Sequence, residues 1–248
     1  MKKTKLIFVF LLSFVLFACS STNTTTKQEE AKQIKASTVS EKEYHSYLSG
    51  REAEVKNAEV VKSQVDLTYN PENTSELEAL SSNIFVGKVI RFDRGVGNKG
   101  ALPYTKGQLE VLSNIKGNAK GKVDFRRLGA IIEVAEDYKG SAAFRIEKAN
   151  YLREQAGLGK VEDDHSLISI FEENDENLKL GSTYLFFATF DKNTNAYDIQ
   201  GFSYGSLELT NKDSKNLRKS SNFEDWKLID KTTGNEISLQ TYIDENLK

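Results

Sequence analysis

Asn83 to Phe92 read NIFVGKVIRF, and this stretch decides the fold. Its apolar side chains fall on both alternating faces, which is typical of a strand buried in the middle of a curled sheet. Gly87 stands inside the run and predicts a bulge or a bend, because a glycine has no side chain to pack within a strand. The sequence therefore predicts that the domain proper begins at Asn83 with a central strand.

The next two segments have the pattern of a β-hairpin. Residues 104–115 alternate as a half-exposed strand does. The apolar face is expected to hold Thr105, Leu109, Val111 and Ile115, and the solvent face Lys106, Gln108 and Glu110. Residues 116–121 read KGNAKG, which predicts a turn, and residues 122–128 are the second strand of the hairpin.

Between Gly129 and Asp164 the strand pattern stops. A helix is predicted there over Ala142 to Ala156, with Ser141 as its N-cap and Gly157 as the residue that ends it. Strands then return over residues 166–171, 183–190 and 197–209, where Gly201 and Gly205 are the expected bend positions.

This order of elements predicts a mainly β (α+β) domain over residues 83–209. A five- to six-stranded antiparallel barrel with its helix after the third strand is the OB-like arrangement, and closing the barrel removes exposed strand edges. The helical insertion is expected at about residues 130–164.

Two regions flank the predicted barrel. Residues 41–82 are expected to be a peripheral lead-in with a short helix over residues 76–81, since Ser75 and Glu78 have the spacing of a capping box. Residues 210–248 are expected to form a C-terminal hairpin and a short helix, over Trp226 to Asp230, Glu236 to Leu239 and Gln240 to Asn246.

Three blocks of the predicted barrel resemble the recurring blocks of uncharacterised Gram-positive surface lipoproteins. They are NIFVGKVI, then LEVLSNIKGNAKG leading into KVDFRRLG, then LKLGSTYLFFATF leading into AYDIQGFSYG. More distantly they are similar to the OB-like barrels of netrin-type and tissue-inhibitor-of-metalloproteinase-type modules. Those inhibitors place an N-terminal cysteine on the protease zinc and rely on disulfides. The only cysteine of this chain, Cys19, is expected to be acylated and to be separated from the barrel by a long tether, so the inhibitory function does not carry over.

Residues 1–18 have the pattern of a secretory signal peptide. Lys2, Lys3 and Lys5 precede an apolar run that is shorter than the about 20 residues a permanent transmembrane helix needs. The following boundary, LFAC, resembles the lipobox of bacterial lipoproteins. The resemblance implies that the thiol of Cys19 carries a diacylglyceryl group, which would hold the protein on the outer face of the cell membrane.

Composition limits the function further. Removing residues 1–18 takes three of the 34 Lys and Arg and none of the 36 Asp and Glu, which leaves a net charge of −5. An acidic chain argues against nucleic acid as a partner. Cys19 is the single cysteine, and with its thiol acylated no thiol is expected to remain for disulfides, cysteine metal sites or cysteine nucleophiles. No cofactor is expected. Residues 19–40 are polar and are expected to be a flexible tether behind the lipidated cysteine.

Two motifs imitate ligand-binding loops. Gly95 to Gly100 is a literal G-x-G-x-x-G, but another strand follows it, so a strand connection is favoured over a dinucleotide site. Asp191 to Asn195 imitates the start of a calcium loop, but Ala196 and Phe202 occupy the places of the essential glycine and the closing carboxylate. A polar hairpin turn is the favoured interpretation.

Charged clusters supply the remaining candidate site residues. The acidic run over residues 172–177 is interpreted as a solvated loop, and a hydrolytic or metal site would have to combine it with Asp163, Asp164 and His165. The other histidine, His45, lies in the lead-in. An anion site on one face of the barrel would need four arginines to converge: Arg91, Arg94, Arg126 and Arg127. Alternation sends neighbouring residues to opposite faces, so structural ion pairing is favoured for them.

The leading hypothesis is a lipid-anchored extracellular protein that acts as a non-enzymatic binding module, with the membrane and a surface protein or cell-wall component as its partners. The alternatives are an exported metal-dependent hydrolase and a protease-inhibitor-like envelope protein that binds through the barrel loops.

Overall fold

A computed structural model describes residues 33–211 and 221–247. The predicted signal peptide, the lipid attachment at Cys19 and the first part of the predicted tether lie outside the described residues. Within the described ranges no helix has both the length and the hydropathy that crossing a bilayer requires.

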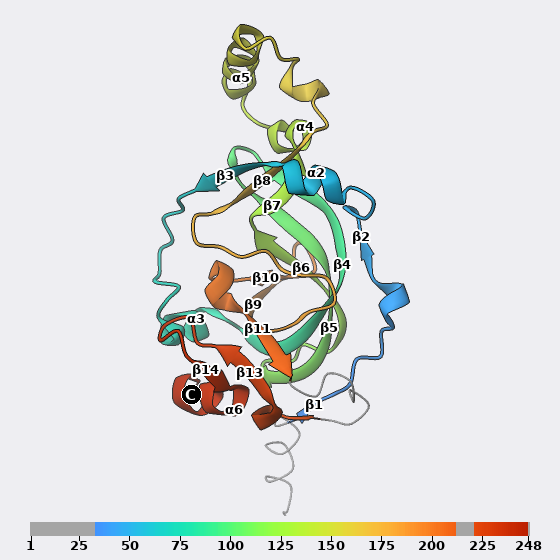
Figure 1. Ribbon diagram of the computed structural model, residues 1–248. Helices are drawn as coiled ribbons and strands as arrows, with labels where there is room; N and C mark the ends of the chain where they lie inside the picture. The colour runs from blue at the N-terminus through green and yellow to red at the C-terminus, as the bar shows by residue number, and fades with distance from the viewer. Residues whose placement is uncertain (1–32, 212–220, 248) are drawn as a thin grey trace, which may run out of the picture.

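The described fold is mainly β, as predicted (Figure 1). The strands are β1 Gln33–Ile34, β2 His45–Ser46, β3 Glu59–Ser63, β4 Asn83–Asn98, β5 Ala101–Lys116, β6 Gly121–Leu128, β7 Ala130–Glu133, β8 Leu167–Glu172, β9 Thr183–Asp191, β10 Ala196–Ile199, β11 Ser206–Asn211, β12 Ser221–Asn222, β13 Trp226–Ile229 and β14 Glu236–Ser238. The helices are η2 Glu41–Glu43, α2 Glu52–Asn57, α3 Thr74–Leu80, α4 Val134–Tyr138, α5 Ala143–Gln155, η3 Val161–Asp163, η4 Phe202–Gly205, η6 Phe223–Asp225 and α6 Leu239–Asn246.

The largest sheet has nine strands in the order β14-β13-β11-β9-β10-β6-β5-β4-β2. An additional pairing joins β9 to β4, so β4, β5, β6, β10 and β9 form a continuous ring of paired strands. The expectation of a purely antiparallel arrangement is wrong, because β6 and β10 run parallel. The segment expected to be the fourth strand, now β8, lies outside the ring in a second sheet of order β3-β8-β7.

Strand β4 is buried on both faces, as its sequence predicts. Ile84 and Val86 belong to one core cluster, and Phe85 and Val89 belong to the other. The two clusters lie on opposite sides of the strand because successive side chains point to opposite faces. The bulge predicted at Gly87 is confirmed, since the pairing with β5 shifts register between Val86 and Gly87.

The C-terminal hairpin and helix are confirmed as β13, β14 and α6. Trp226 on β13 and Leu239 and Tyr242 on α6 are buried in the same cluster as Ile84. The predicted bends at Gly201 and Gly205 are also confirmed, because η4 separates β10 from β11 there and Gly201 has a φ of 65°. These residues extend the core beyond the strand ring.

The stretch predicted to contain no strand, from Gly129 to Asp164, holds β7 at its start. Gly129 turns the chain with a φ of 87°, and Ala130 and Ile132 are then buried as β7 pairs with β8. The predicted helix is confirmed as α5, but Ser141 is not its N-cap. The Ser141 hydroxyl instead accepts a hydrogen bond from Arg145 at 2.7 Å.

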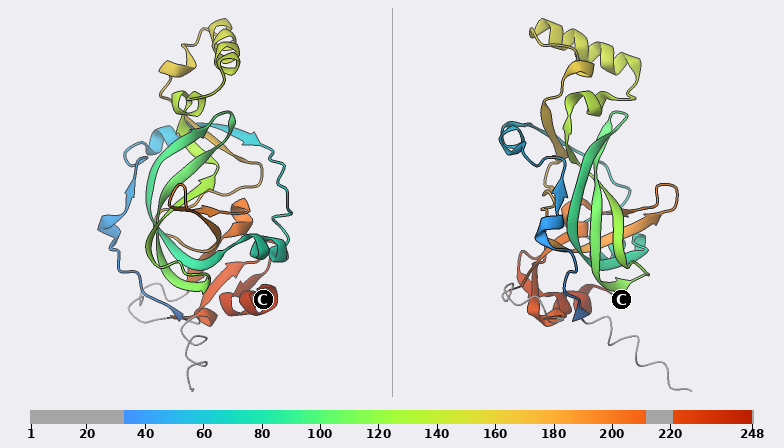
Figure 2. Two further views of the ribbon diagram at one scale, coloured as in Figure 1. Left: turned by 180° about the vertical axis from the view of Figure 1, so that it is seen from behind. Right: turned by 90° about the vertical axis from the view of Figure 1, so that its right-hand side faces the viewer.

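Helix α5 projects away from the strand ring in every view (Figures 1 and 2). None of its residues is buried. Phe144, Tyr151 and Leu152 are exposed, and their spacing of seven and eight residues places them on one side of the helix. The helical insertion therefore projects from the domain and contributes no residue of α5 to the core.

The short helix of the lead-in, α3, begins two residues earlier than predicted. Its N-cap is Asn73, whose Oδ1 accepts hydrogen bonds from the backbone N–H groups of Ser75 at 3.1 Å and Glu76 at 3.4 Å. The Asn73 side chain in turn donates to Glu76 at 3.0 Å. An asparagine satisfies these free N–H groups as well as a serine does, so the capping residue and its acidic partner both shift by two positions.

Residues 33–48 pack on the ring as a strap, which differs from the predicted tether. Ile34 is 2% exposed, and the backbone N–H of Lys35 donates to the carbonyl of Leu112 on β5 at 3.1 Å. Glu110, predicted to face solvent, is 6% exposed because the strap covers it. It accepts hydrogen bonds from both side-chain hydroxyls of Ser37 and Thr38 and from the Thr38 N–H.

The environment of Glu110 favours its charged form. Burial by itself raises the pKa of this carboxyl, but the hydrogen bonds from Ser37 and Thr38 outweigh burial and hold the pKa below its ordinary value. A carboxylate of β5 therefore fixes the strap at its middle.

Candidate functional site

The four arginines form ion pairs, as predicted, and do not converge. Arg91 lies 2.8 Å from Asp93, and Arg94 lies 3.1 Å from Glu133. Arg126 and Arg127 point to opposite faces of β6. Arg126 faces outward and Arg127 faces the interior.

The glycine motif over residues 95–100 forms the end of β4 and the β4–β5 turn, and no helix follows it. A Cβ at Gly97 would lie 2.3 Å from the carbonyl oxygen of Glu136, so this glycine lets α4 pack directly on β4. The favoured interpretation as a strand connection is confirmed. Its glycines serve close packing of the chain against itself.

The Asp191 to Asn195 segment is a polar hairpin turn, as predicted. Asp191 Oδ1 accepts from the N–H of Asn193 and its Oδ2 accepts from the hydroxyl of Thr194, each at 2.9 Å. These local hydrogen bonds are the reason that aspartate favours turns.

The residues of the hydrolase alternative lie apart. Asp164 binds Arg153 at 2.6 Å, and His165 Nδ1 lies 3.0 Å from Glu133. In the acidic loop, Asp175 pairs with Arg127 and Glu176 binds Lys231. Within residues 33–211 and 221–247, no group of three or more His, Cys, Asp or Glu side chains has the arrangement of a metal site.

Glu133 holds together the elements around His165. Its side chain is 8% exposed, and its carboxylate also lies 3.0 Å from Arg51. Burial raises the pKa of Glu133, but the hydrogen bonds from His165 and Arg51 and the charge of Arg94 outweigh it and hold the pKa below its ordinary value. The Glu133 carboxylate is ionised, and its ion pairs connect β7 to Arg94 on β4 and to Arg51 at the start of α2.

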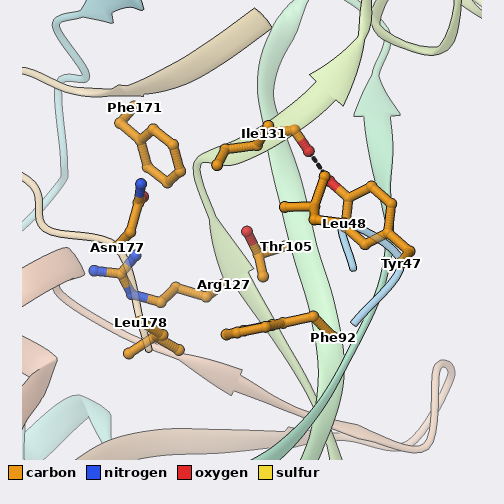
Figure 3. Close-up of a pocket in the computed structure, with 9 residues that line it drawn as sticks. All are labelled: Tyr47, Leu48, Phe92, Thr105, Arg127, Ile131, Phe171, Asn177 and Leu178. Atoms are coloured by element: carbon orange, nitrogen blue, oxygen red, sulfur yellow. Dashed lines mark hydrogen bonds between the residues drawn. The ribbon is translucent and has the colours of Figure 1, made fainter. Parts of the chain in front are cut away.

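A pocket of about 60 Å³ lies at the end of the strand ring (Figure 3). Its walls are mostly apolar, and two of its hydroxyl groups bind backbone carbonyls. The Tyr47 hydroxyl donates to the carbonyl of Ile131, and the Thr105 hydroxyl donates to the carbonyl of Gly129. The volume is that of a few water molecules, which is small for a ligand site.

Arg127 forms one side of this pocket and binds Asp175 behind it. Their side chains are 1% and 0% exposed. The guanidinium donates through Nη2 to Asp175 Oδ1 and, at 3.0 Å, to the carbonyl of Glu176. Burial raises the pKa of Asp175, while the charge of Arg127 opposes that rise. This pair closes the loop over residues 172–177 onto the interior.

A groove of about 330 Å³ runs over the outer face of β5 and β6, and we call it the β5–β6 groove. The end of β4 and the β9–β10 turn flank it. The lining residues that carry its chemistry are Asp93, Tyr104, Lys106, Asp124, Arg126 and Thr194.

Arg126 is fixed at the centre of the groove. Its Nε and Nη2 donate to the two carboxylate oxygens of Asp198 on β10 at 2.7 Å and 2.6 Å, and Nη2 also lies 3.0 Å from Asp191. The hydrogen bonds and charge of Asp198 raise the pKa of Arg126. The guanidinium carbon lies 5.4 Å from the centre of the Tyr104 ring, a cation–π distance. The parallel register of β6 and β10 places Asp198 opposite Arg126, while the antiparallel pairing of β5 with β6 places Tyr104 beside it.

The groove can recognise a polar ligand. It combines the aromatic ring of Tyr104 with cations and carboxylates, which can donate to and accept from the polar groups of a ligand. Sequence reasoning named Arg126 but missed Tyr104. Strand alternation could have predicted Tyr104. Tyr104 and Lys106 lie two positions apart on β5 and therefore share a face, and Lys106 is opposite Arg126.

Comparisons with known proteins add no relative: no family model, curated protein or solved structure matches this chain.

Proposed function

We propose that the protein is a lipoprotein held on the outer face of the cell membrane through Cys19. The basic start, the short apolar run and the lipobox-like LFAC support this proposal. Two acyl chains give a stable anchor where a single chain is marginal, because each buried methylene contributes about 0.8 kcal/mol. The strap then begins at Gln33, fourteen residues after the anchor.

Replacing Cys19 with alanine is expected to abolish lipid labelling and membrane retention, because no other thiol exists to be acylated. The measurement is metabolic labelling with a palmitate analogue, together with fractionation of membranes and medium. Globomycin is expected to cause accumulation of the unprocessed form of the wild-type chain. A C19A protein that is labelled and retained like wild type would exclude the anchor.

We infer that the strand ring is an OB-like barrel. The ring order β4-β5-β6-β10-β9 corresponds to strands 1-2-3-5-4 of a five-stranded Greek-key barrel, and the helical insertion falls between the third and fourth strands. OB barrels bind oligonucleotides and oligosaccharides on the face of strands 2 and 3, between the loop after strand 1 and the loop after strand 4. The β5–β6 groove occupies the corresponding position.

The function that this geometry supports best is non-enzymatic binding of an oligosaccharide of the cell wall. The observation that carries it is the groove itself, where Tyr104 and the Arg126 guanidinium lie between two strand turns. Carboxylates and cations side by side suit the many hydroxyl groups of a sugar chain. The net charge of −5 after residues 1–18 disfavours an oligonucleotide. The separation of Asp163, Asp164 and His165 from the acidic loop gives the hydrolase alternative no support.

Replacing Tyr104 with alanine is expected to weaken binding of solubilised Gram-positive cell-wall glycan at least about tenfold, equivalent to 1.4 kcal/mol, because it removes the aromatic face of the groove. Calorimetry with the purified full chain in detergent is the measurement. The matched control is Tyr151→Ala, which removes a tyrosine that is 62% exposed on α5. Equal affinity of both variants and wild type would place the binding site elsewhere.

A further inference from the structure

A second cleft lies between the strap and the outer surface of the sheet. Its volume is about 530 Å³, within the range of small-molecule sites. Lys35 and Tyr44 border it from the strap, and Lys88 on β4 and Trp226 on β13 border it from the sheet. It shares no lining residue with the β5–β6 groove.

Trp226 lines this cleft, and its indole carries a buried hydrogen-bond donor just behind the cleft wall. The residue is 5% exposed, and its indole Nε1 has no acceptor among the described residues. An indole N–H can only donate, and none of the described residues supplies its acceptor. Buried donors are normally satisfied, and such an exception calls for an explanation.

Two lysines of the cleft have no carboxylate partner among the described residues. Neither Lys35 nor Lys88 takes part in an ion pair there, although most of the arginines around the ring do. Lys88 Nζ lies 5.5 Å from the centre of the Tyr44 ring, which holds the ammonium group at the cleft without neutralising it. Glu41 is the single carboxylate among the residues that line the cleft.

We propose that this cleft binds a phosphate ester. The two ammonium groups of Lys35 and Lys88 match a group that carries up to two negative charges and three strong acceptor oxygens. The aromatic and hydroxyl groups around it, including Thr183 and Thr210, suit an attached polar alcohol. Such a phosphate belongs either to a soluble ester or to the headgroup of a phospholipid. This site is independent of the glycan site proposed above.

The chain contains a built-in reporter for this proposal. Trp226 is the only tryptophan, so the intrinsic tryptophan fluorescence of the protein comes from this cleft alone. Glycerol 3-phosphate added to the full chain in detergent is expected to change the emission in a saturable manner. Potassium chloride at equal ionic strength is expected to give no saturable change. Absence of a saturable change with both glycerol 3-phosphate and phosphatidylglycerol would overturn the proposal.

Variants test which groups make the site. Lys88→Gln and Lys35→Gln are each expected to raise the dissociation constant at least about tenfold, because each removes a positive charge. The matched control is Lys148→Gln, an exposed lysine on the projecting helix α5, which is expected to bind like wild type. An equal loss in all three variants would show only general charge attraction and would refute the site.

Two further arms separate the sources and the two sites. Phosphatidylglycerol in the detergent micelles, compared with phosphatidylcholine, measures binding of the lipid headgroup, whereas glycerol 3-phosphate measures the soluble ester. Tyr104→Ala is expected to leave the fluorescence response unchanged. Loss of glycan binding with an intact phosphate response, or the reverse, therefore identifies which of the two proposals fails.

Discussion

Replacing Asp175 with alanine is expected to lower the free energy of unfolding by about 3–5 kcal/mol, the usual result of leaving a buried charge without its partner. A guanidinium group is a permanent cation in proteins, so the substitution leaves a positive charge in the interior. Its side chain is 1% exposed and its main charged contact is Asp175. The measurement is urea unfolding followed by circular dichroism, in which the midpoint should fall.

The control for this prediction uses the neighbouring arginine. Arg126 and Asp198 are 20% and 31% exposed, and Arg126 also contacts Asp191, so Asp198→Ala should cost only about 1 kcal/mol or less. A double variant, Arg127→Met with Asp175→Leu, removes both charges and is expected to recover most of the loss. If Asp175→Ala is as mild as Asp198→Ala, water reaches the pair and the buried ion pair does not govern stability.

Replacing Gly107 with alanine is expected to destabilise the strand ring by at least the roughly 1–3 kcal/mol that overpacking costs. A Cβ at this position would lie 2.0 Å from the carbonyl oxygen of Arg91 and 2.8 Å from the ring of Phe125. The carbonyl is backbone, so rotating a side chain cannot relieve the overlap, and β4 and β5 must separate. Gly107 also lines the β5–β6 groove, so glycan affinity should fall together with the melting temperature.

Gly159→Ala provides the comparison, because a Cβ there meets no atom within 4 Å. Its effect on stability should stay within about 0.5 kcal/mol. Equal melting temperatures for both alanine variants would show that the β4–β5 pairing adapts to the added methyl group, contrary to the expectation.

The strands that the sequence predicts best are those whose own residues carry the signal. β4 and β9 are apolar on both faces, and burial on both faces follows directly from that composition. β7 is different, since its four residues AIIE are too few to show a period. They become a strand because β8, more than thirty residues later, pairs with them.

The strap was missed for a similar reason. Ile34 and Val39 are isolated apolar residues in a polar segment, so composition predicts a tether. The group that fixes the strap is Glu110, and it lies more than seventy residues away in the chain. A carboxylate on the polar face of a strand predicts solvent exposure unless the sequence also reveals what covers it.

The candidate site could be predicted only in its parts. The pairing tendency of Arg126 followed from alternation and composition. The partner that holds its guanidinium depends on the parallel pairing of β6 with β10, which brings Asp198 to Arg126 from 72 residues away. No local pattern encodes that parallel pairing. The unpaired lysines of the second cleft likewise become visible only when the strap lies on the sheet.

The attachment of the strap to β5 determines how mechanical force passes through the protein. With the proposed anchor at Cys19, the fourteen peptide units to Gln33 reach at most about 50 Å. Drag on the domain would be transmitted through the backbone bond from Lys35 to Leu112 and the hydroxyl bonds to Glu110. Tension from the membrane would therefore be shared between β12, which pairs with β1, and β5, a strand of the ring that also lines the β5–β6 groove. In this arrangement, tension on the strap and binding of a ligand in the β5–β6 groove would both act on the backbone of β5.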